Sequence, residues 1–208
     1  MSERGQFKNG KVYIPVLSFT EECGEGLFQS LGLDPAGVGQ IPFGNKTIEL
    51  ELFPLVDQVH DGLAAVLAKA DACLMVVRFL DQLSMNRIKD AFHLIGAETF
   101  LPKTIAIFRE PKEVEFKISC TYCGQKLWVR DRDSGRRGNC PKCHKTFFIP
   151  TQKAFVTSFL MLTESVPVVT VTREDPSCLH AVTSLVERIA SMEEGLKSST
   201  IRIEIPPE

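Results

Sequence analysis

The sequence lacks the features that direct a protein into or across a membrane. Residues Met1 to Lys11 are polar and contain none of the apolar run of a signal peptide. The longest apolar stretch without a charge, Ala154–Thr163, is far too short to span a bilayer. We therefore expect a cytoplasmic protein with no membrane insertion. The chain also has no internal repeat and no low-complexity tract, which excludes a repeat architecture.

The cysteine content does not fit a disulfide framework. The chain has seven cysteines, an odd number, and four of them lie in two Cys-x-x-Cys pairs. This usage indicates metal binding in a reducing compartment. With 208 residues, 44% of them hydrophobic, the chain is long enough to bury a core without disulfides.

A convincing catalytic set is also missing. Cys23 follows the first predicted strand, where a reactive thiol is possible, but an idle or buried thiol is the more frequent case. Cys73 and Cys178 are predicted to pack in the core. His60 and Asp61 are adjacent in sequence, which does not make a dyad. His93 and His180 are predicted on helices, and His144, next to Cys143, is predicted at the surface and not as a fifth metal ligand. We expect no enzyme activity.

Alternating apolar strands and amphipathic helices predict a doubly wound α/β fold with a mostly parallel sheet. One glycine- and proline-rich stretch, Asp34–Asn45, is predicted as a loop. The strands are expected at Lys11–Ser18, Lys46–Phe53, Ala72–Phe79, Lys103–Phe108 and Val166–Thr172, with a short alternating run at Ile201–Ile205. The helices are expected at Gly26–Gly32, Asp61–Ala70, Ser84–Ile95 with Ser84 as N-cap, Lys153–Leu162 and Ser177–Glu193.

Two cysteine pairs interrupt this pattern and predict one structural zinc ion. Cys120 and Cys123 form the first pair, and Cys140 and Cys143 form the second. Thiolates are favourable zinc ligands, and two residues between cysteines let one turn present both sulfurs to the same ion. A closed site with four sulfurs leaves no position for a reacting water, so catalysis at this zinc is not expected.

The segment between Cys120 and Pro150 resembles a common bacterial zinc-ribbon family with four cysteine ligands. The resemblance covers about thirty residues and includes CxxCG, KLWV, GRRG and CPKC. Residues 116–150 are therefore predicted to form an inserted ribbon, in which Phe116–Ile118 and Thr146–Ile149 run side by side. Residues 1–115 and 151–208 are predicted to form one discontinuous α/β domain.

The predicted ribbon is strongly basic. Residues 117–145 contain eight basic and two acidic residues, a formal charge of +6, whereas the other 16 basic and 24 acidic residues give −8. Basic residues beside an exposed aromatic can bind phosphates and stack on bases, or they can offset the charge of the zinc thiolates and bind an acidic protein. The candidate partner-binding residues are Trp128, Arg130, Arg132, Arg136 and Arg137.

The order of elements in residues 11–116 and 150–195 resembles that of the small Ras-like GTPases, best in the stretch from Lys46 to Phe79. The nucleotide motifs of that family are missing. If Gly24 is the last glycine of the phosphate loop, Glu25 replaces the lysine and Gly26 replaces the magnesium-binding hydroxyl. The phosphate-sensing turn corresponds to Pro54–Asp57, with Gln58 retained. The guanine-reading motif falls near Phe108–Pro111 and is absent.

The resemblance thus implies a pseudo-GTPase, with no nucleotide expected; another doubly wound fold, such as a receiver-like domain, stays open. We expect a non-catalytic, zinc-containing regulatory or interaction protein. Its protein partner is expected to bind through the ribbon and the face formed by the carboxyl ends of the strands. Two alternatives remain: a nucleic-acid-binding module that uses the basic ribbon, and a divergent nucleotide-binding enzyme.

Overall fold

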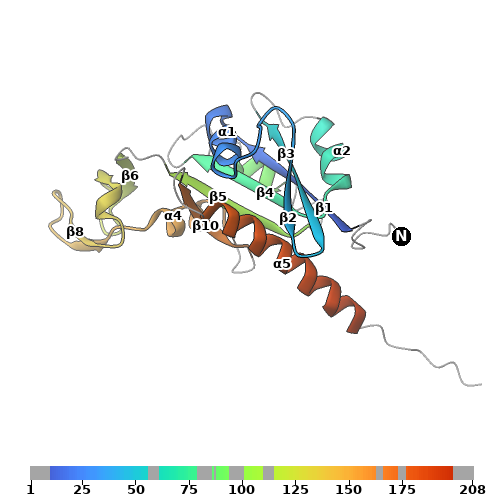
Figure 1. The fold of residues 1–208 in the computed structure, drawn as a ribbon. Helices are drawn as coiled ribbons and strands as arrows, with labels where there is room; N and C mark the ends of the chain where they lie inside the picture. Colours follow the sequence, from blue (N-terminus) through green and yellow to red (C-terminus); the bar gives the residue numbers. More distant parts are fainter. Residues whose placement is uncertain are drawn as a thin grey trace, which may run out of the picture.

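A six-stranded sheet covered by helices on both faces forms the larger part of the molecule, and a small ribbon stands at one end of it (Figure 1). The structure is a computed structural model. It describes residues 10–55, 61–78, 86, 88–93, 101–109, 115–162, 166–172 and 177–198. Among these residues, no helix is long and apolar enough to cross a membrane.

The sheet is parallel except at one edge. β1 and β4 are its central strands because almost all of their side chains are apolar and buried on both faces. β3 alternates buried and half-exposed residues, and it is next to the edge as its sequence pattern predicts. The strand order is β10 (Val168–Thr172), β5 (Lys103–Arg109), β4 (Cys73–Arg78), β1 (Lys11–Ser18), β3 (Lys46–Pro54) and β2 (Val38–Phe43).

The stretch Asp34–Asn45 is not a loop throughout, so that prediction is wrong. Val38–Phe43 forms β2, which pairs antiparallel with β3 and turns into it at Gly44 and Asn45. An edge strand needs hydrogen bonds on one side only, so it tolerates Pro42. Gly39 is buried against the side chain of Leu33, and a Cβ atom at this position would lie too close to that side chain.

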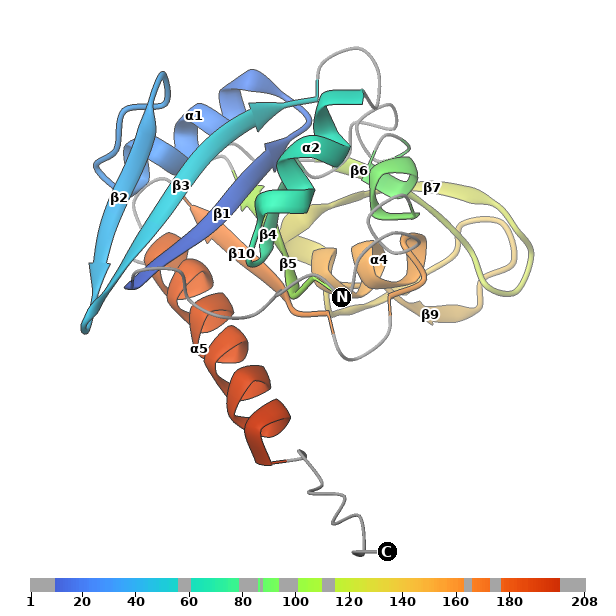
Figure 2. The same ribbon diagram turned by 90° about the vertical axis from the view of Figure 1, so that its right-hand side faces the viewer.

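The helices form two layers (Figure 2). α1 (Glu21–Ser30) and α5 (Ser177–Ser198) cover one face of the sheet, where their buried residues join those of the strands. α2 (Asp61–Lys69), helical residues 88–93 and α4 (Gln152–Phe159) cover the other face. This two-layer arrangement confirms the predicted doubly wound fold class.

The helix bounds differ most from the prediction at α1 and α5, and α4 ends at Phe159, three residues before the predicted end. α1 begins at Glu21, five residues before the predicted start, and its two glycines lie inside the helix. α5 continues to Ser198 and extends beyond the sheet (Figures 1 and 2). Ser84, the predicted N-cap, and the run Ile201–Ile205 lie outside the described residues.

The ribbon consists of two hairpins rather than one closed loop. β6 (Glu115–Ser119) pairs with β7 (Lys126–Arg130), and β8 (Arg137–Asn139) pairs with β9 (Thr146–Phe148), with the short helix η2 (Asp131–Asp133) between them. The predicted pairing of Phe116–Ile118 with Thr146–Ile149 is therefore wrong. Each cysteine pair lies in a turn that reverses the chain, so the strand before the turn pairs with the strand after it.

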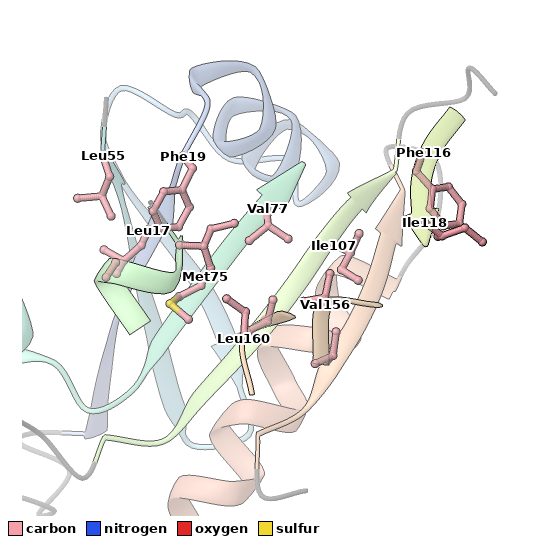
Figure 3. Close-up of a cluster of buried hydrophobic side chains, with 14 of the residues drawn as sticks. Leu17, Phe19, Leu55, Met75, Val77, Ile107, Phe116, Ile118, Val156 and Leu160 are labelled. Carbon is pink, nitrogen blue, oxygen red and sulfur yellow. The ribbon is translucent and has the colours of Figure 1, made fainter. Parts of the chain in front are cut away.

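The ribbon shares a core with the α/β domain. Its apolar residues, among them Phe116 and Ile118, belong to the same buried cluster as Leu17, Met75 and Leu160 of the larger domain (Figure 3). The ring of Phe116 meets that of Phe155 on α4 edge to face, with centroids 6.2 Å apart. The insertion is thus packed onto the layer that contains α4.

Candidate metal centre and strand-end face

The first cysteine pair forms a tight turn. The N–H of Cys120 donates to the carbonyl of Gln125 over 2.8 Å, and the N–H of Gly124 donates to the carbonyl of Cys120 over 2.9 Å. Gly124 has φ 69°, in the left-handed region that glycine adopts without steric cost. This turn brings Cys120 and Cys123 to the same side of the chain.

The second pair repeats this geometry. Cys140 donates to the carbonyl of Lys145 over 3.1 Å, and His144 donates to the carbonyl of Cys140 over 2.9 Å. His144 takes the place of Gly124 and has φ 57°, while its side chain is exposed. The turn requires a left-handed backbone at this position, whereas a role as metal ligand does not. The conformation of His144 is therefore explained by the turn.

The four sulfurs form one cluster. Sγ of Cys120 lies 3.7 Å from Sγ of Cys143, Sγ of Cys123 lies 3.6 Å from Sγ of Cys140, and all four atoms lie within 4.8 Å of one another. A tetrahedron with metal–sulfur bonds of about 2.3 Å has edges of about 3.8 Å. The four cysteines therefore fit a tetrahedral metal ion and could hold one.

Backbone N–H groups favour thiolate in this cluster. Those of Cys143 and Lys142, with smaller contributions from neighbouring thiols, lower the pKa of Cys140 to about 6. At Cys123 the N–H of Gln125 acts in the same direction, but burial and the three neighbouring thiols together raise the pKa to about 11. The sulfur of Cys140 thus becomes an anion at a lower pH than that of Cys123, and a bound cation would favour the thiolate form of its ligands.

The predicted partner-binding residues all lie on the ribbon surface. Trp128 is 64% exposed, and the ammonium of Lys117 lies 4.5 Å from the centre of its ring. Arg130 lies 3.4 Å from Glu115 of the paired strand. Arg132 lies in η2, Arg136 precedes β8 and Arg137 begins it, and all three side chains are exposed.

An ion pair joins the ribbon to the end of the sheet. Arg109, the last residue of β5, lies 2.7 Å from Asp131 of η2, whose carboxylate side chain is only 8% exposed. Figure 1 shows the ribbon beyond the carboxyl end of β5. The guanine-reading motif of Ras-like proteins would fall at this point of the sequence, where Phe108 is buried and Glu110 and Pro111 lie outside the described residues.

The connection between β1 and α1 is two residues long. β1 ends at Ser18 and α1 begins at Glu21, so Phe19 and Thr20 alone join them, and Phe19 is buried. The hydroxyl of Ser18 donates to the carbonyl of Thr20. The predicted alignment of Ser18–Gly26 with a phosphate loop is therefore wrong in its geometry, because most of that segment is helix.

Gly24 and Gly26 allow α1 to pack closely against the sheet. A Cβ atom on Gly24 would lie 2.8 Å from Cβ of Ser18, and one on Gly26 would lie 2.6 Å from the ring tip of Phe108. Both distances are below any normal contact. The two glycines, which resemble loop glycines in the sequence, are packing residues of a buried helix face.

Substituting serine for Gly26 is expected to destabilise the fold by about 1–3 kcal/mol, because the added atoms overpack the contact with Phe108. Urea unfolding followed by circular dichroism measures this change. Gly62→Ser is the matched control, since a Cβ on this exposed glycine of α2 lies at an ordinary 3.8 Å from Phe53. An equal midpoint for both variants would show that α1 does not pack this closely.

The other residues considered for chemistry do not form a second site among the described residues. Cys23, Cys73 and Cys178 are buried, and burial raises the pKa of Cys73 to about 12. His93 and His180 are exposed. Pro54 ends β3 and Leu55 is buried, whereas His60 and the segment 56–58 lie outside the described residues.

No protein-family model and no curated protein matches the sequence. Among solved structures, the fold is similar to two mutation variants of SsGBP, with TM-scores of 0.51 and 0.53 and 15% identity; they cover 86% and 89% of this chain. It is also similar to a GTP-binding protein from the hyperthermophilic archaeon Sulfolobus solfataricus in complex with GDP, with a TM-score of 0.52, 14% identity and 87% of this chain covered.

This chain spans 53–57% of the length of those proteins. At such low identity the similarity shows the fold alone. The chain therefore has a mostly parallel α/β fold that is similar to the fold of these proteins, and it carries a cluster of four cysteines that could hold a metal ion.

Proposed function

We propose that this protein is a non-catalytic regulatory or interaction protein, in which a pseudo-GTPase domain displays a zinc-stabilised ribbon to a partner. The observation that carries the proposal is the two-residue connection between β1 and α1. A phosphate loop needs a run of backbone N–H groups and a lysine around the phosphates. Phe19 and Thr20 supply neither a loop of that length nor a cation.

The charge at this end of the sheet supports the same conclusion. α1 begins with Glu21 and Glu22, and the carboxylate of Glu22 is paired with Arg78 at the end of β4 over 3.4 Å. The carboxylate of Glu22 in the first turn of the helix opposes the binding of a triphosphate, and the pair occupies a cation that could otherwise contact it. The strand-end face is thus organised by contacts within the protein.

Zinc is the metal proposed for the four cysteines. Four thiolates in a tetrahedral arrangement suit zinc, and such a site is closed to a reacting water. The ion would hold the two hairpins together through Cys120, Cys123, Cys140 and Cys143. Its role would be structural, which agrees with the non-catalytic function proposed.

We place the binding surface for a protein partner on the strand-end face and the adjoining ribbon. The ion pair between Arg109 and Asp131 fixes the ribbon beside the carboxyl ends of the strands, so one partner can contact both. The alternative with a specific observation in its favour is nucleic acid, which the basic and aromatic ribbon surface suits.

Fluorescent GDP and GTP, titrated into the zinc-loaded protein with magnesium present, are expected to show no saturable binding at high micromolar concentration. The physical reason is the missing phosphate loop and the carboxylates that stand in its place. Saturable binding, together with an increased melting temperature in the presence of the nucleotide, would contradict the proposal and favour a divergent nucleotide-binding enzyme.

A further inference from the structure

The hairpin of β6 and β7 has one face that is basic and aromatic throughout most of its length. Alternation along β7 places Lys126, Trp128 and Arg130 on the same face, at intervals of about 6.8 Å. Register places Lys117 of β6 opposite Trp128. We call these four residues, Lys117, Lys126, Trp128 and Arg130, the basic outer face.

The orientation of this face is fixed by what lies behind it. The alternate residues Phe116, Ile118 and Val129 are buried in the core that the ribbon shares with α4. If the strands shifted by one residue, these apolar side chains would face solvent and the cations would face the core. The loss of apolar burial and the burial of charge make that register unfavourable. The basic outer face therefore points to solvent in the folded protein.

The acidic residues near this face lie at its end or contact other parts of the protein. Glu115 lies at its far end and is paired with Arg130 over 3.4 Å, between two exposed side chains. Asp131, the next residue along the chain, instead contacts Arg109 of the sheet and is nearly buried. Lys117, Lys126 and Trp128 thus form the central part of a surface with positive charge.

A second aromatic and cation pair continues this pattern at the metal cluster. Tyr122 lies in the turn between Cys120 and Cys123 and is 58% exposed, and the ammonium of Lys145, from the other cysteine turn, lies 4.9 Å from the centre of its ring. The pair links the two turns, so its geometry depends on the four sulfurs. Aromatic rings beside cations therefore occur both on the hairpin and at its tip.

We propose that the basic outer face binds single-stranded nucleic acid, with a base stacked on Trp128 and phosphates contacted by Lys117, Lys126 and Arg130. Single strands offer unpaired base faces and regularly spaced phosphates, which aromatic rings with flanking cations can bind without reading sequence. A duplex buries its base faces. This inference rests on the proposed function and refines it: the outer face of the hairpin takes nucleic acid, the second candidate partner, while a protein partner keeps the strand-end face and the part of the ribbon beside Asp131.

The same face fits an acidic protein less well. The central parts of protein–protein interfaces are depleted of charged residues, and of lysine in particular, because burying an ammonium is costly. Here two lysines and one arginine surround a single aromatic side chain, with no exposed aliphatic residue among them. Phosphates can neutralise these cations while both remain partly solvated.

The test uses the full-length, zinc-loaded chain and a short fluorescein-labelled oligothymidylate. Binding is expected to quench the emission of Trp128, the only tryptophan in the chain, and to raise the fluorescein anisotropy over the same concentration range. Three phosphate contacts predict a slope of about −2 for the logarithm of the affinity against that of the salt concentration. Trp128→Ser is expected to weaken binding about ten-fold, whereas Trp128→Phe, which keeps a stacking ring, retains most of the affinity.

Lys126→Glu and Lys153→Glu form the matched pair of charge reversals, since Lys153 is exposed on α4, away from the basic outer face. Lys126→Glu is expected to abolish binding, and Lys153→Glu to leave it unchanged. Equal losses in both variants, or binding of polyglutamate but not of the oligonucleotide, would overturn the proposal, the latter in favour of an acidic protein. Zinc content measured on every variant separates these outcomes from loss of the ribbon, and the nucleotide titration tests the proposed function independently.

Discussion

Substituting serine for Cys140 is expected to remove the metal from the protein and to unfold the ribbon. Cys140 is fully buried in the cluster, and its sulfur lies 3.6 Å from that of Cys123. In zinc-finger peptides, metal binding contributes about 10–16 kcal/mol of folding free energy, so losing one of four ligands removes the main stabilisation of a module this small. Metal analysis should find one zinc per wild-type chain and little or none in the variant, and limited proteolysis should cleave the ribbon faster in the variant.

His144→Gly is the matched control for this experiment. His144 is adjacent to Cys143, but it is exposed and adopts φ 57°. Glycine adopts that conformation without the steric cost of a side chain, about 1–2 kcal/mol, so this variant should keep its zinc and melt at an equal or higher temperature. If Cys140→Ser retained stoichiometric zinc, or His144→Gly lost it, the four-cysteine assignment would be wrong.

The buried strands and the cluster of four cysteines could be predicted because each leaves a local signal. The run from Cys73 to Val77 is apolar without interruption, which a strand buried on both faces requires. The cysteine spacing reports a turn of fixed geometry, which the structure shows twice, at Gly124 and at His144. In both cases the residues that determine the structure are neighbours in sequence.

The start of α1 could not be predicted because its signal is ambiguous. Gly24 and Gly26 are typical of a loop, and glycine is unfavourable inside a helix. Their reason lies elsewhere in the chain, at Ser18, Leu52 and Phe108, which approach the helix too closely for a side chain. Tertiary packing overrides helix propensity here, and a single sequence does not show which distant residues will meet.

The same limit applies to the contact between the ribbon and the α/β domain. The sequence predicts an inserted ribbon at residues 116–150, but nothing in its local pattern indicates that Phe116 meets Phe155 or that Arg109 meets Asp131. These contacts join residues that lie far apart along the chain. They couple the cysteine cluster to the stability of α4, which lies directly after the ribbon.

Substituting alanine for Phe116 is expected to lower the free energy of unfolding by about 3–5 kcal/mol. The side chain is 1% exposed and packs edge to face on Phe155, so its removal leaves a cavity where the ribbon meets α4. Because the cavity lies in a shared core, both parts of the molecule should lose stability together. Thermal unfolding is followed by Trp128 emission for the ribbon and by far-ultraviolet circular dichroism for the helices.

Phe148→Ala makes the same chemical change on a ribbon side chain that is 59% exposed, and its expected effect is within about 0.5 kcal/mol. Coincident transitions that shift to lower temperature in Phe116→Ala would show that ribbon and α/β domain unfold as one cooperative unit. Two separate transitions, with the helices unaffected, would mean that the ribbon is an independent module. A cooperative unit would transmit zinc loss to α4 and the strand-end face, which would make the metal a determinant of partner binding beyond the ribbon itself.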